Sequence, residues 1–567
     1  MALFAPSESP AVVVREIDLT GGVPNVQSTT GAFVGAFTTG PTNKRVLVNN
    51  EAELVATFGA PTDSNAVDFL TATQFLRYSG SLYVTRAIDS SGYAHASDGT
   101  AAQVGDQDQF EAGTWTGNFF ARQPGTVGNG IAVKFWKGDS ANTNFSTWTY
   151  SGSFNGAPGT SNSVVAKGSS DDEFHIVVVD SDGLITGTKG TVLETFEDVS
   201  ILTDAKDYQG VSQFATEVVN NTSDYIYLNN IAALANYGGT SALNTSYAES
   251  ATVDSSYLLT GGANGADVSL SDILYGWDLY EDKDQVEIDF MIARDMNDST
   301  NQNTLVNDLV ATARLGRKDC MVVASPTKKA VIGVTSDADK VTKIVAQTDG
   351  YTKSSYLTVD GNFLKVYDKY NDKYRWIPSC STVAGCMAAT DVNRAAWFSP
   401  AGSRRGQMFG ITSLAFSPTK GQRDVLYKAG VNPIANIPGQ GALLFGDKTK
   451  LGRISAFDRI NVRRLFLILE RAIGKAAEQV LFELNDEFTR AEFVNIVEPV
   501  LREVQGRRGI TDFRVVCDET NITPAVIDRN EFKADIFIKP ARSINYVTLS
   551  FVAVRTGVDF EEVVGTV

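Results

Sequence analysis

The chain has 567 residues and a formal net charge of −17. This length exceeds what one hydrophobic core organises and predicts several domains, and the acidic balance disfavours a nucleic-acid partner because phosphates would be repelled. No window approaches the roughly 18–20 apolar residues of a membrane span, and the N-terminus lacks a signal-peptide pattern. We therefore expect a multidomain protein without a membrane span that folds in a reducing cytoplasm.

The N-terminal segment Ala11–Leu19 (AVVVREIDL) has the composition of a strand. Gly21, Gly22 and Pro24 break the chain directly after it, so the segment has no local partner. A terminal strand of this kind either completes the sheet of its own domain or pairs with a neighbouring chain.

The next part of the chain alternates strand and helix signals, which is typical of an α/β domain. From Ser90 to about Ser200 the composition shifts to Gly, Ser, Thr, Asn and aromatic residues, which predicts an all-β insertion. The α/β pattern returns from about Asp204 to Ser325, and Asn371-Asp372 is expected to form the turn of a hairpin. The expected strands and helices are Ala32–Phe37, Arg45–Val48, Ala66–Tyr78, Ser81–Ala87, Ile131–Trp136, Phe174–Asp180, Asp224–Leu228, Gln285–Ile292, Asn303–Leu315, Cys320–Ala324, Phe363–Tyr370, Lys373–Ile377, Val383–Asp391 and Val392–Phe398.

The last part of the chain, from about Lys448, is expected to hold two helices and a run of strands. Apolar residues recur every three or four positions through Arg459–Leu484, which predicts one amphipathic helix. Thr489 followed by Glu492 is a capping-box pattern that predicts the start of a second helix. Strands are expected at Phe513–Asp518, before Lys539–Pro540, and at Tyr546–Arg555.

A final strand-like segment, Val558–Val564, has no partner left in the chain behind it. Together with Ala11–Leu19 it gives the chain an extended apolar arm at each end. Reciprocal donation of these arms to neighbouring subunits would satisfy the backbone groups of both. The residues assigned to this exchange are Val12, Val13, Val14, Arg15, Ile17, Val558, Phe560, Val563 and Val564.

A basic run precedes the amphipathic helix of this otherwise acidic chain. Residues 447–464 contain six basic and two acidic side chains. The run forms either a solvated helix face with salt bridges to the acidic residues that follow, or a docking surface for an acidic partner, and composition leaves both open. The six basic residues are Lys448, Lys450, Arg453, Arg459, Arg463 and Arg464.

The sequence carries no pattern that supports catalysis or a cofactor. His95 and His175 are the two histidines, and both fall in the β-rich insertion as expected surface or hydrogen-bonded residues. Thr260–Gly265 is glycine-rich without a Lys at P-loop spacing, and Asp180–Gly183 lacks the closing Glu of a calcium loop, so it is expected to be a tight turn. The four cysteines lack zinc-ligand spacing, which predicts buried thiols. We therefore predict no enzyme, no metal site and no cofactor.

Several separated stretches carry recognisable motifs. They are Ser9–Asp18, Ser81–Ala87, Pro124–Asn129, Val383–Asp391 with Trp397, Asn432–Ile434, Cys517–Asn521 through Pro524, Ile538–Ala541 and the closing strand. In this order, from one end of the chain to the other, they resemble the tail sheath proteins of contractile-tailed bacteriophages, most closely the large T-even-type sheaths. One departure is Pro10-Ala11, where Pro-Gly is common in the family.

The resemblance implies a structural subunit that forms a helical homopolymer in a virion tail assembled in the host cytoplasm. It implies that the C-terminal domain lies innermost against the tail tube, that the insertion projects outward, and that the two arms add strands to the C-terminal sheets of neighbours. Contraction would then switch between two packings of the same subunits without nucleotide. The implied partners are further copies, the tail tube protein, and the baseplate and tail terminator proteins. The basic run becomes the candidate contact with the tube.

The expected fold class is multidomain, with α/β middle domains and an α+β C-terminal domain. The expected domains are an N-terminal arm at 1–20, α/β middle domains at 21–90 and 201–400, a β-rich outermost insertion at 91–200, an inner C-terminal domain at 401–556 and a C-terminal arm at 557–567. A bacteriocin or injection-system sheath is the alternative, although such sheaths usually lack so large an insertion. The helix-rich C-terminal part disfavours a secreted adhesin built of β modules.

Overall fold

The computed structural model describes two compact units, each of which is treated by itself below. The larger unit comprises the described residues up to Ala396 together with Pro400–Arg463. The smaller unit comprises Trp397–Ser399 and the described residues from Arg464 onward. The described residues are 29–42, 44–137, 144–247, 255–265, 267–518, 521–522 and 524–544.

The larger unit is built on a six-stranded sheet with the strand order β14-β13-β12-β1-β3-β2. All neighbouring strands are parallel except β2, which pairs antiparallel with β3. The strands are short apolar runs, as expected where helices cover both faces of a parallel sheet. Their bounds are β1 Gly31–Ala36, β2 Val46–Val48, β3 Leu82–Ala87, β12 Phe290–Ile292, β13 Met321–Ala324 and β14 Leu357–Val359.

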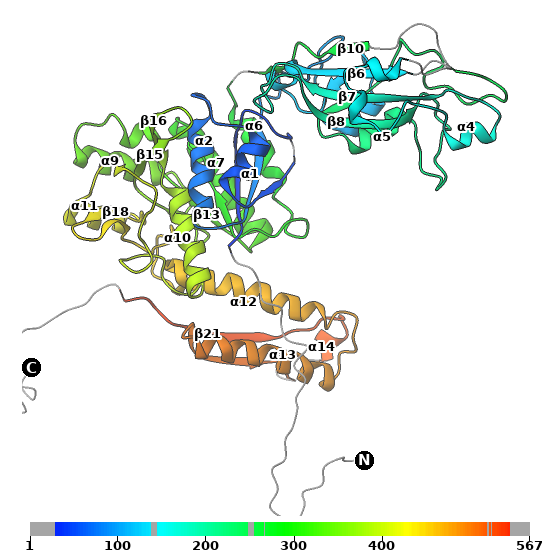
Figure 1. The fold of residues 1–567 in the computed structure, drawn as a ribbon. Helices are drawn as coiled ribbons and strands as arrows, with labels where there is room; N and C mark the ends of the chain where they lie inside the picture. Colours follow the sequence, from blue (N-terminus) through cyan, green and yellow to red (C-terminus); the bar gives the residue numbers. More distant parts are fainter. Residues whose placement is uncertain are drawn as a thin grey trace, which may run out of the picture. The chain divides into compact units, whose positions relative to one another are not determined.

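Helices cover both faces of this sheet, and together they form what we call the body (Figure 1). Successive residues of β1 point to opposite faces of the sheet. Val34 packs at Gly276 of α6 on one face. Gly31 and Gly35 pack against Phe75 and Asp68 of α2 on the other. Helix α10 lies with α2, and α7 lies with α6. The helices are α1 Glu51–Phe58, α2 Ala66–Leu76, α6 Leu270–Asp278, α7 Ser299–Ala311 with a π-helical continuation at Thr312–Arg317, α8 Lys328–Val331, α9 Asp337–Thr348, α10 Cys380–Asn393 and α11 Lys420–Lys428.

The expected hairpin after the sheet is confirmed. Its strands pair antiparallel, and Asp372 in the turn has a φ of 50°. Short strands from residues that follow α10 complete this region of the body. The strands are β15 Phe363–Asp368, β16 Lys373–Pro378, β17 Ser413–Leu414, β18 Ile434–Ile437 and β19 Gly441–Leu444.

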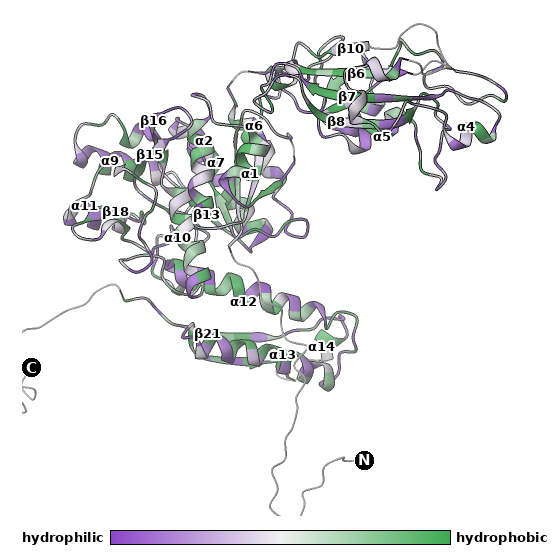
Figure 2. Ribbon diagram, in the orientation of Figure 1, coloured by the Kyte–Doolittle hydropathy of each residue, from purple (hydrophilic) through white to green (hydrophobic). Residues whose placement is uncertain are grey.

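The β-rich insertion between β3 and α6 contains a four-stranded antiparallel sheet with the order β10-β6-β7-β8. Hydrophobic residues gather on its inner strands, and β7 is buried along its whole length (Figure 2). Two strand pairs, β5 with β9 and β4 with β11, flank the sheet. The elements are β4 Tyr93–Ala94, α3 Gln107–Ala112, β5 Phe119–Ala121, β6 Ile131–Lys137, α4 Asn162–Ala166, β7 Glu173–Asp180, β8 Thr191–Ser200, α5 Ala215–Thr222, β9 Ile226–Leu228, β10 Ser255–Leu258 and β11 Ala263–Asn264.

The insertion is therefore longer than the sequence predicts. It runs from Tyr93 to Asn264 instead of ending near Ser200, since β9 pairs with β5 and β10 pairs with β6. These partners lie more than 100 residues apart in the chain, so no local pattern reveals them. The expected return of an α/β pattern at Asp204 was wrong for this reason.

The smaller unit contains two long helices, one short helix and two strands in its described part. Apolar residues of α13, namely Phe493, Val497, Leu501 and Val504, are buried. The elements are α12 Ile460–Glu478, which begins in the larger unit, α13 Glu487–Gly506, β20 Ile510–Val516, α14 Pro524–Ile527 and β21 Asp535–Pro540. Both predicted helices and both predicted strands within the described residues are confirmed.

Three boundaries at this end of the chain differ from the sequence expectation. Helix α12 ends at Glu478, so Leu484 lies outside it and is exposed. The N-cap of α13 is Asp486, whose carboxylate accepts from the Thr489 N–H, and Thr489 is inside the helix. Residues 401–463 belong to the larger unit, because they pack with the body and not with the C-terminal helices.

Among the described residues, no helix is long and apolar enough to cross a membrane. The thiols of Cys320, Cys380 and Cys386 are buried and that of Cys517 is half-buried, and none of the four forms a disulfide. The prediction of buried thiols is thus confirmed for three of the four cysteines.

Candidate functional site

The predicted strand donors lie outside the described residues. This applies to Ala11–Leu19, to Val558–Val564 and to the expected strand Tyr546–Arg555. It therefore applies to each residue assigned to strand exchange, which are Val12, Val13, Val14, Arg15, Ile17, Val558, Phe560, Val563 and Val564.

The predicted acceptor is the sheet of the smaller unit. Strands β20 and β21 pair antiparallel, with Phe513 opposite Ile538 and Arg514 opposite Phe537. Within the described part of the chain this sheet has two strands, so each strand presents one edge to no other described strand. Phe537 is 60% exposed on it. An edge of this kind offers alternate N–H and C=O groups to an added strand.

The junction between α13 and β20 holds this sheet against the helix. The Gly509 N–H donates to the carbonyl of Val504 across 2.8 Å, and the Trp397 indole donates to the carbonyl of Arg507 across 3.1 Å. A Cβ at Gly509 would lie 2.6 Å from Val504 and 3.0 Å from Trp397. Only glycine fits this close approach, and the two strands are thereby fixed relative to α13.

The first half of the basic run folds around Tyr427. The Lys448 ammonium donates to the Tyr427 carbonyl across 2.9 Å and lies 4.2 Å from the ring centroid. The Lys450 ammonium is buried and donates to the carbonyl of Ala429 across 2.8 Å, and burial lowers its pKa to about 8. Arg453 is exposed. The structure thus brings Lys448 and Lys450 into the body and leaves Arg453 at the surface.

The second half of the run is also engaged by the fold. Arg459 forms an ion pair with Asp447 across 3.0 Å. The buried guanidinium of Arg463 donates to the Ser355 hydroxyl across 2.7 Å and lies between the Tyr356 and Phe457 rings, and Arg464 is buried as well. Five of the six basic side chains therefore make contacts within the chain or are buried, and Arg453 is the one whose side chain faces solvent.

Both histidines are buried in the insertion and are held by backbone groups. The His95 ring nitrogens lie 2.8 Å from the Ala121 carbonyl and 3.0 Å from the Val104 carbonyl, and burial lowers the pKa of this histidine. His175 Nδ1 accepts from the Asp198 N–H across 3.0 Å, so its Nε2–H donates to the Gly156 carbonyl. Of the two predicted alternatives, surface or hydrogen-bonded, both histidines are hydrogen-bonded and neither lies at the surface.

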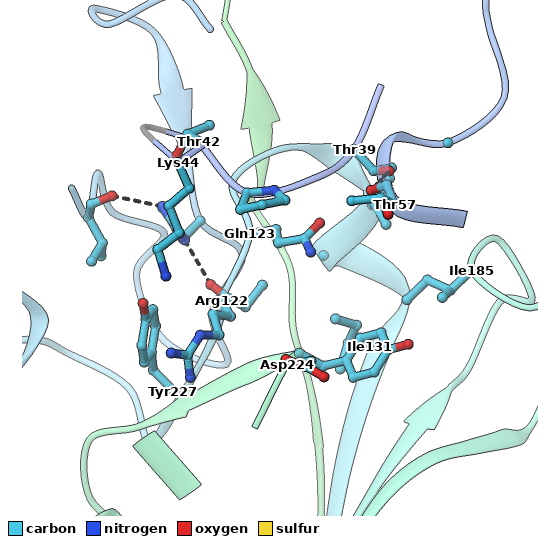
Figure 3. A pocket seen from close by; sticks show the side chains of 18 of the residues that line it. Thr39, Thr42, Lys44, Thr57, Arg122, Gln123, Ile131, Ile185, Asp224 and Tyr227 are labelled. Carbon is cyan, nitrogen blue, oxygen red and sulfur yellow. Dashed lines mark hydrogen bonds between the residues drawn. The ribbon is translucent and has the colours of Figure 1, made fainter. Parts of the chain in front are cut away.

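A pocket of about 700 Å³ lies where the body meets the insertion (Figure 3). Thr39, Lys44 and Thr57 line it from the body, and Arg122 and Tyr227 line it from the insertion. The Arg122 guanidinium donates to the carbonyls of residues 220 and 223 and lies over the Tyr227 ring, so it is already engaged. Among the described residues there is no cluster of three or more metal-ligating side chains. The Asp180 carboxylate caps a tight turn, as predicted.

Arg86, at the end of β3, links the body to the insertion, and sequence reasoning missed it. Its buried guanidinium donates to the carbonyls of Phe37, Thr38 and Gly40 in the body at 3.0–3.2 Å. It also donates to the Pro124 carbonyl across 3.0 Å and to the Asn264 side chain across 3.4 Å. The sequence signal for this role was a single Arg at the end of an apolar strand, because a charged side chain at a buried position needs several hydrogen-bond acceptors.

Comparisons with known proteins all find tail sheath proteins, and the alignment with one relative covers almost the whole chain. The family described as "Phage tail sheath protein central domain" matches residues 271–450, and "Phage tail sheath C-terminal domain" matches residues 454–553. The tail sheath protein of Enterobacteria phage T4 is 31% identical over 668 aligned positions, which cover 98% of this chain and 99% of the relative.

Two solved structures share the fold at low sequence identity. The sheath tail protein of Listeria innocua aligns with a TM-score of 0.54 and 12% identity over 92% of this chain and 97% of that one. The helical sheath of the anti-feeding prophage, in its contracted state, aligns with a TM-score of 0.51 and 13% identity over 97% of this chain and 99% of that one. The mixed arrangement of helices and strands is therefore the one seen in sheath proteins.

Proposed function

Because the chain belongs to the phage tail sheath family, we propose that it polymerises helically around a tail tube and contracts to drive the tube through the host envelope. Tail sheath proteins are structural components of the virion tail. The observation that carries the proposal is the match to the T4 tail sheath protein over almost the full length of both chains. The T4 relative is 31% identical to this chain, whereas the anti-feeding prophage sheath is 13% identical to it. The difference in identity favours a phage tail over an injection-system particle.

Polymerisation proceeds in this proposal by strand exchange. The arms around Val12–Ile17 and Val558–Val564 add to the edges of the β20–β21 sheet of neighbouring subunits. An arm that pairs about six residues at ~0.5–1.5 kcal/mol per hydrogen bond contributes several kcal/mol, in addition to its buried valines. Repeated along a polymer, such a tether keeps subunits connected while they move. The two-stranded described sheet and its exposed Phe537 support this assignment.

Contraction is a switch between two packings of the same folded subunits, with the extended packing metastable. The energy is stored in the assembly, so the subunit needs no nucleotide, metal or catalytic group. The partners proposed are further copies of the chain, the tail tube, and the baseplate and terminator proteins at the two ends. Assembly takes place in the host cytoplasm.

Contact with the tube is assigned in this proposal to the basic run, and the exposure of its side chains favours one of the six residues. Lys448, Lys450, Arg459, Arg463 and Arg464 are buried or bonded within the chain. Arg453 is exposed, in the segment between β19 and α12. Arg453 is therefore the residue of the run that we propose meets an acidic tube surface.

Electron microscopy of the purified full-length protein tests the proposal. We expect helical tubes without any added cofactor, since strand exchange needs only further copies of the chain. A protein that stays monomeric at every concentration, with and without tube protein, would contradict the proposed function.

A further inference from the structure

An exposed apolar surface lies at the turn between α12 and α13. Its four side chains, which we call the apolar tip, lie within eight residues and belong to Leu481, Phe482, Leu484 and Phe488, with exposed fractions of 62%, 105%, 76% and 86%. Large apolar side chains gathered in solvent mark interaction surfaces in soluble proteins. The tip is therefore expected to be covered in the working state of the protein.

The backbone directs the tip outward. Phe482 has a φ of 71°, in the left-handed region that a bulky side chain seldom adopts. Such a conformation costs on the order of 1–3 kcal/mol and is found where function requires it. The residue before the cap of α13, Asn485, donates to the Glu531 carbonyl across 3.0 Å, which ties the turn to the segment before β21. The tip is thus presented from a fixed turn.

Acidic residues lie among and beside the tip residues along the chain. All of them are exposed, and Asp486 also caps α13. Acidic side chains at a helix N-terminus interact favourably with the helix dipole, which explains their presence here. The dipole does not explain why four large apolar side chains beside them are exposed to solvent. The acidic residues are Glu478, Glu483, Asp486, Glu487 and Glu492.

The opposite end of the same layer is basic. Helix α13 has 20 residues and so separates the two ends by roughly 30 Å. At its far end the Ala541 N–H donates to the Gly509 carbonyl across 3.0 Å, which brings the neighbouring residues Arg508 and Arg542 together. Both arginines are exposed. Figure 1 shows the α12–α13 turn at the end of the layer that holds α14, and the chain after β21 leaving from the other end.

We propose that the apolar tip of one subunit docks on the Arg508–Arg542 end of the next copy of the chain. Guanidinium groups pair with carboxylates and stack on aromatic rings, so one arginine-rich surface fits both the acidic and the aromatic parts of the tip. The two surfaces differ and lie at opposite ends of one unit, so the contact is heterologous and propagates along a polymer instead of closing a dimer. The inference rests on the proposed function and adds a side-chain contact to the backbone exchange of the arms.

Charge exchange in the full-length protein tests this contact. Glu483→Arg with Glu487→Arg, or Arg508→Glu with Arg542→Glu, places like charges across the interface. Each pair is expected to raise the critical concentration for tube formation at least about tenfold. All four substitutions in one chain should restore assembly, because they reverse both sides. Sedimentation and electron microscopy measure the critical concentration, and circular dichroism checks that each variant is folded.

A second pair of variants tests the apolar part. Phe482→Ser with Phe488→Ser should raise the critical concentration, whereas the matched control Tyr208→Ser with Leu243→Ser, at exposed positions of the insertion, should not. Unchanged assembly of the tip variants, or no rescue by the fourfold exchange, would overturn the docking contact. Normal sheath assembly with loss of tube protein would also overturn it and assign the tip to the tube. If the wild-type protein forms tubes, the proposed function holds, and a negative result with the variants then concerns the docking contact alone.

Discussion

The hydroxyl of Ser325 donates a hydrogen bond across 2.8 Å to the buried carboxyl of Asp360. The two residues follow adjacent parallel strands, β13 and β14, and the hydroxyl of Ser379 donates to the same carboxyl oxygen. Burial raises the pKa of Asp360 to about 7, although both hydroxyl donors favour the ionised form. The body therefore contains an acid that is largely neutral below neutral pH.

The first prediction concerns this acid. Because its pKa is higher in the folded state than the usual 3.8, the folded protein retains a proton that the unfolded chain releases between about pH 4 and 7. The free energy of unfolding should fall as pH rises through this window, by up to ~4 kcal/mol. Asp360→Asn keeps an oxygen for the two hydroxyls and removes the titration, so its stability should change less between pH 4.5 and 7.5.

Denaturant unfolding of both proteins at several pH values measures the effect. Asp424→Asn, at an exposed position of α11, is the control and should retain the slope of the wild type. A variant at position 360 with the same pH slope as the wild type would show that Asp360 is ionised in the folded state across this range.

The second prediction concerns Arg86. Arg86→Met leaves four backbone carbonyls and the Asn264 amide oxygen without their shared donor, and each buried group left unpaired costs about 1–3 kcal/mol. We expect a loss of at least about 3 kcal/mol in unfolding free energy, and faster proteolysis at the two crossings between body and insertion. Arg314→Met, at an exposed position, should have neither effect. Wild-type protease resistance in the Arg86 variant would remove the linking role.

A third prediction tests strand exchange. Deletion of residues 1–20 or 557–567 should leave monomers with wild-type circular dichroism that form no tubes, because the β20–β21 edge then lacks its added strand. Analytical ultracentrifugation and electron microscopy provide the measurement. Normal tubes from either truncated chain would end the strand-exchange proposal.

The fourth prediction concerns the tube. Arg453→Glu reverses the exposed charge of the basic run and should reduce co-sedimentation of tube protein with the sheath while sheath tubes still form. Lys189→Glu, at an exposed turn of the insertion, is the matched control. Reversal of Arg459 or Arg463 is unsuitable as a test, since these side chains bond to Asp447 and Ser355 within the fold. Unchanged co-sedimentation would remove Arg453 from the proposed contact.

The sequence predicts the elements of this fold better than their grouping. Local patterns reveal β1, β3, β7 and the two C-terminal helices, because period and capping are properties of neighbouring residues. Pairing of β10 with β6 depends on residues more than 100 positions apart, which explains why the insertion extends beyond its predicted end. Topology of this kind is set by long-range packing that no window of sequence contains.

Candidate site residues show the same limit. The charge of the run from Lys448 to Arg464 is visible in the sequence, but the burial of its side chains is not. A solvated helix face was one of the two expectations for this run, whereas the Arg463 guanidinium lies between two aromatic rings. Leu484 continues the apolar period of α12 and yet faces solvent, because the helix ends at Glu478 and the new cap at Asp486 starts another. Periodicity identifies the apolar residues but does not say which of them the monomer covers.

The pairing of β4 with β11 has a consequence for how this protein can change. Tyr93 lies opposite Asn264, so the chain enters and leaves the insertion at the same place. A segment that begins and ends side by side can be enlarged, shortened or exchanged without moving the strands of the body. The insertion can therefore accept foreign sequences while the strand order of the body is unaltered, as long as Pro124 and Asn264 keep their hydrogen bonds to Arg86.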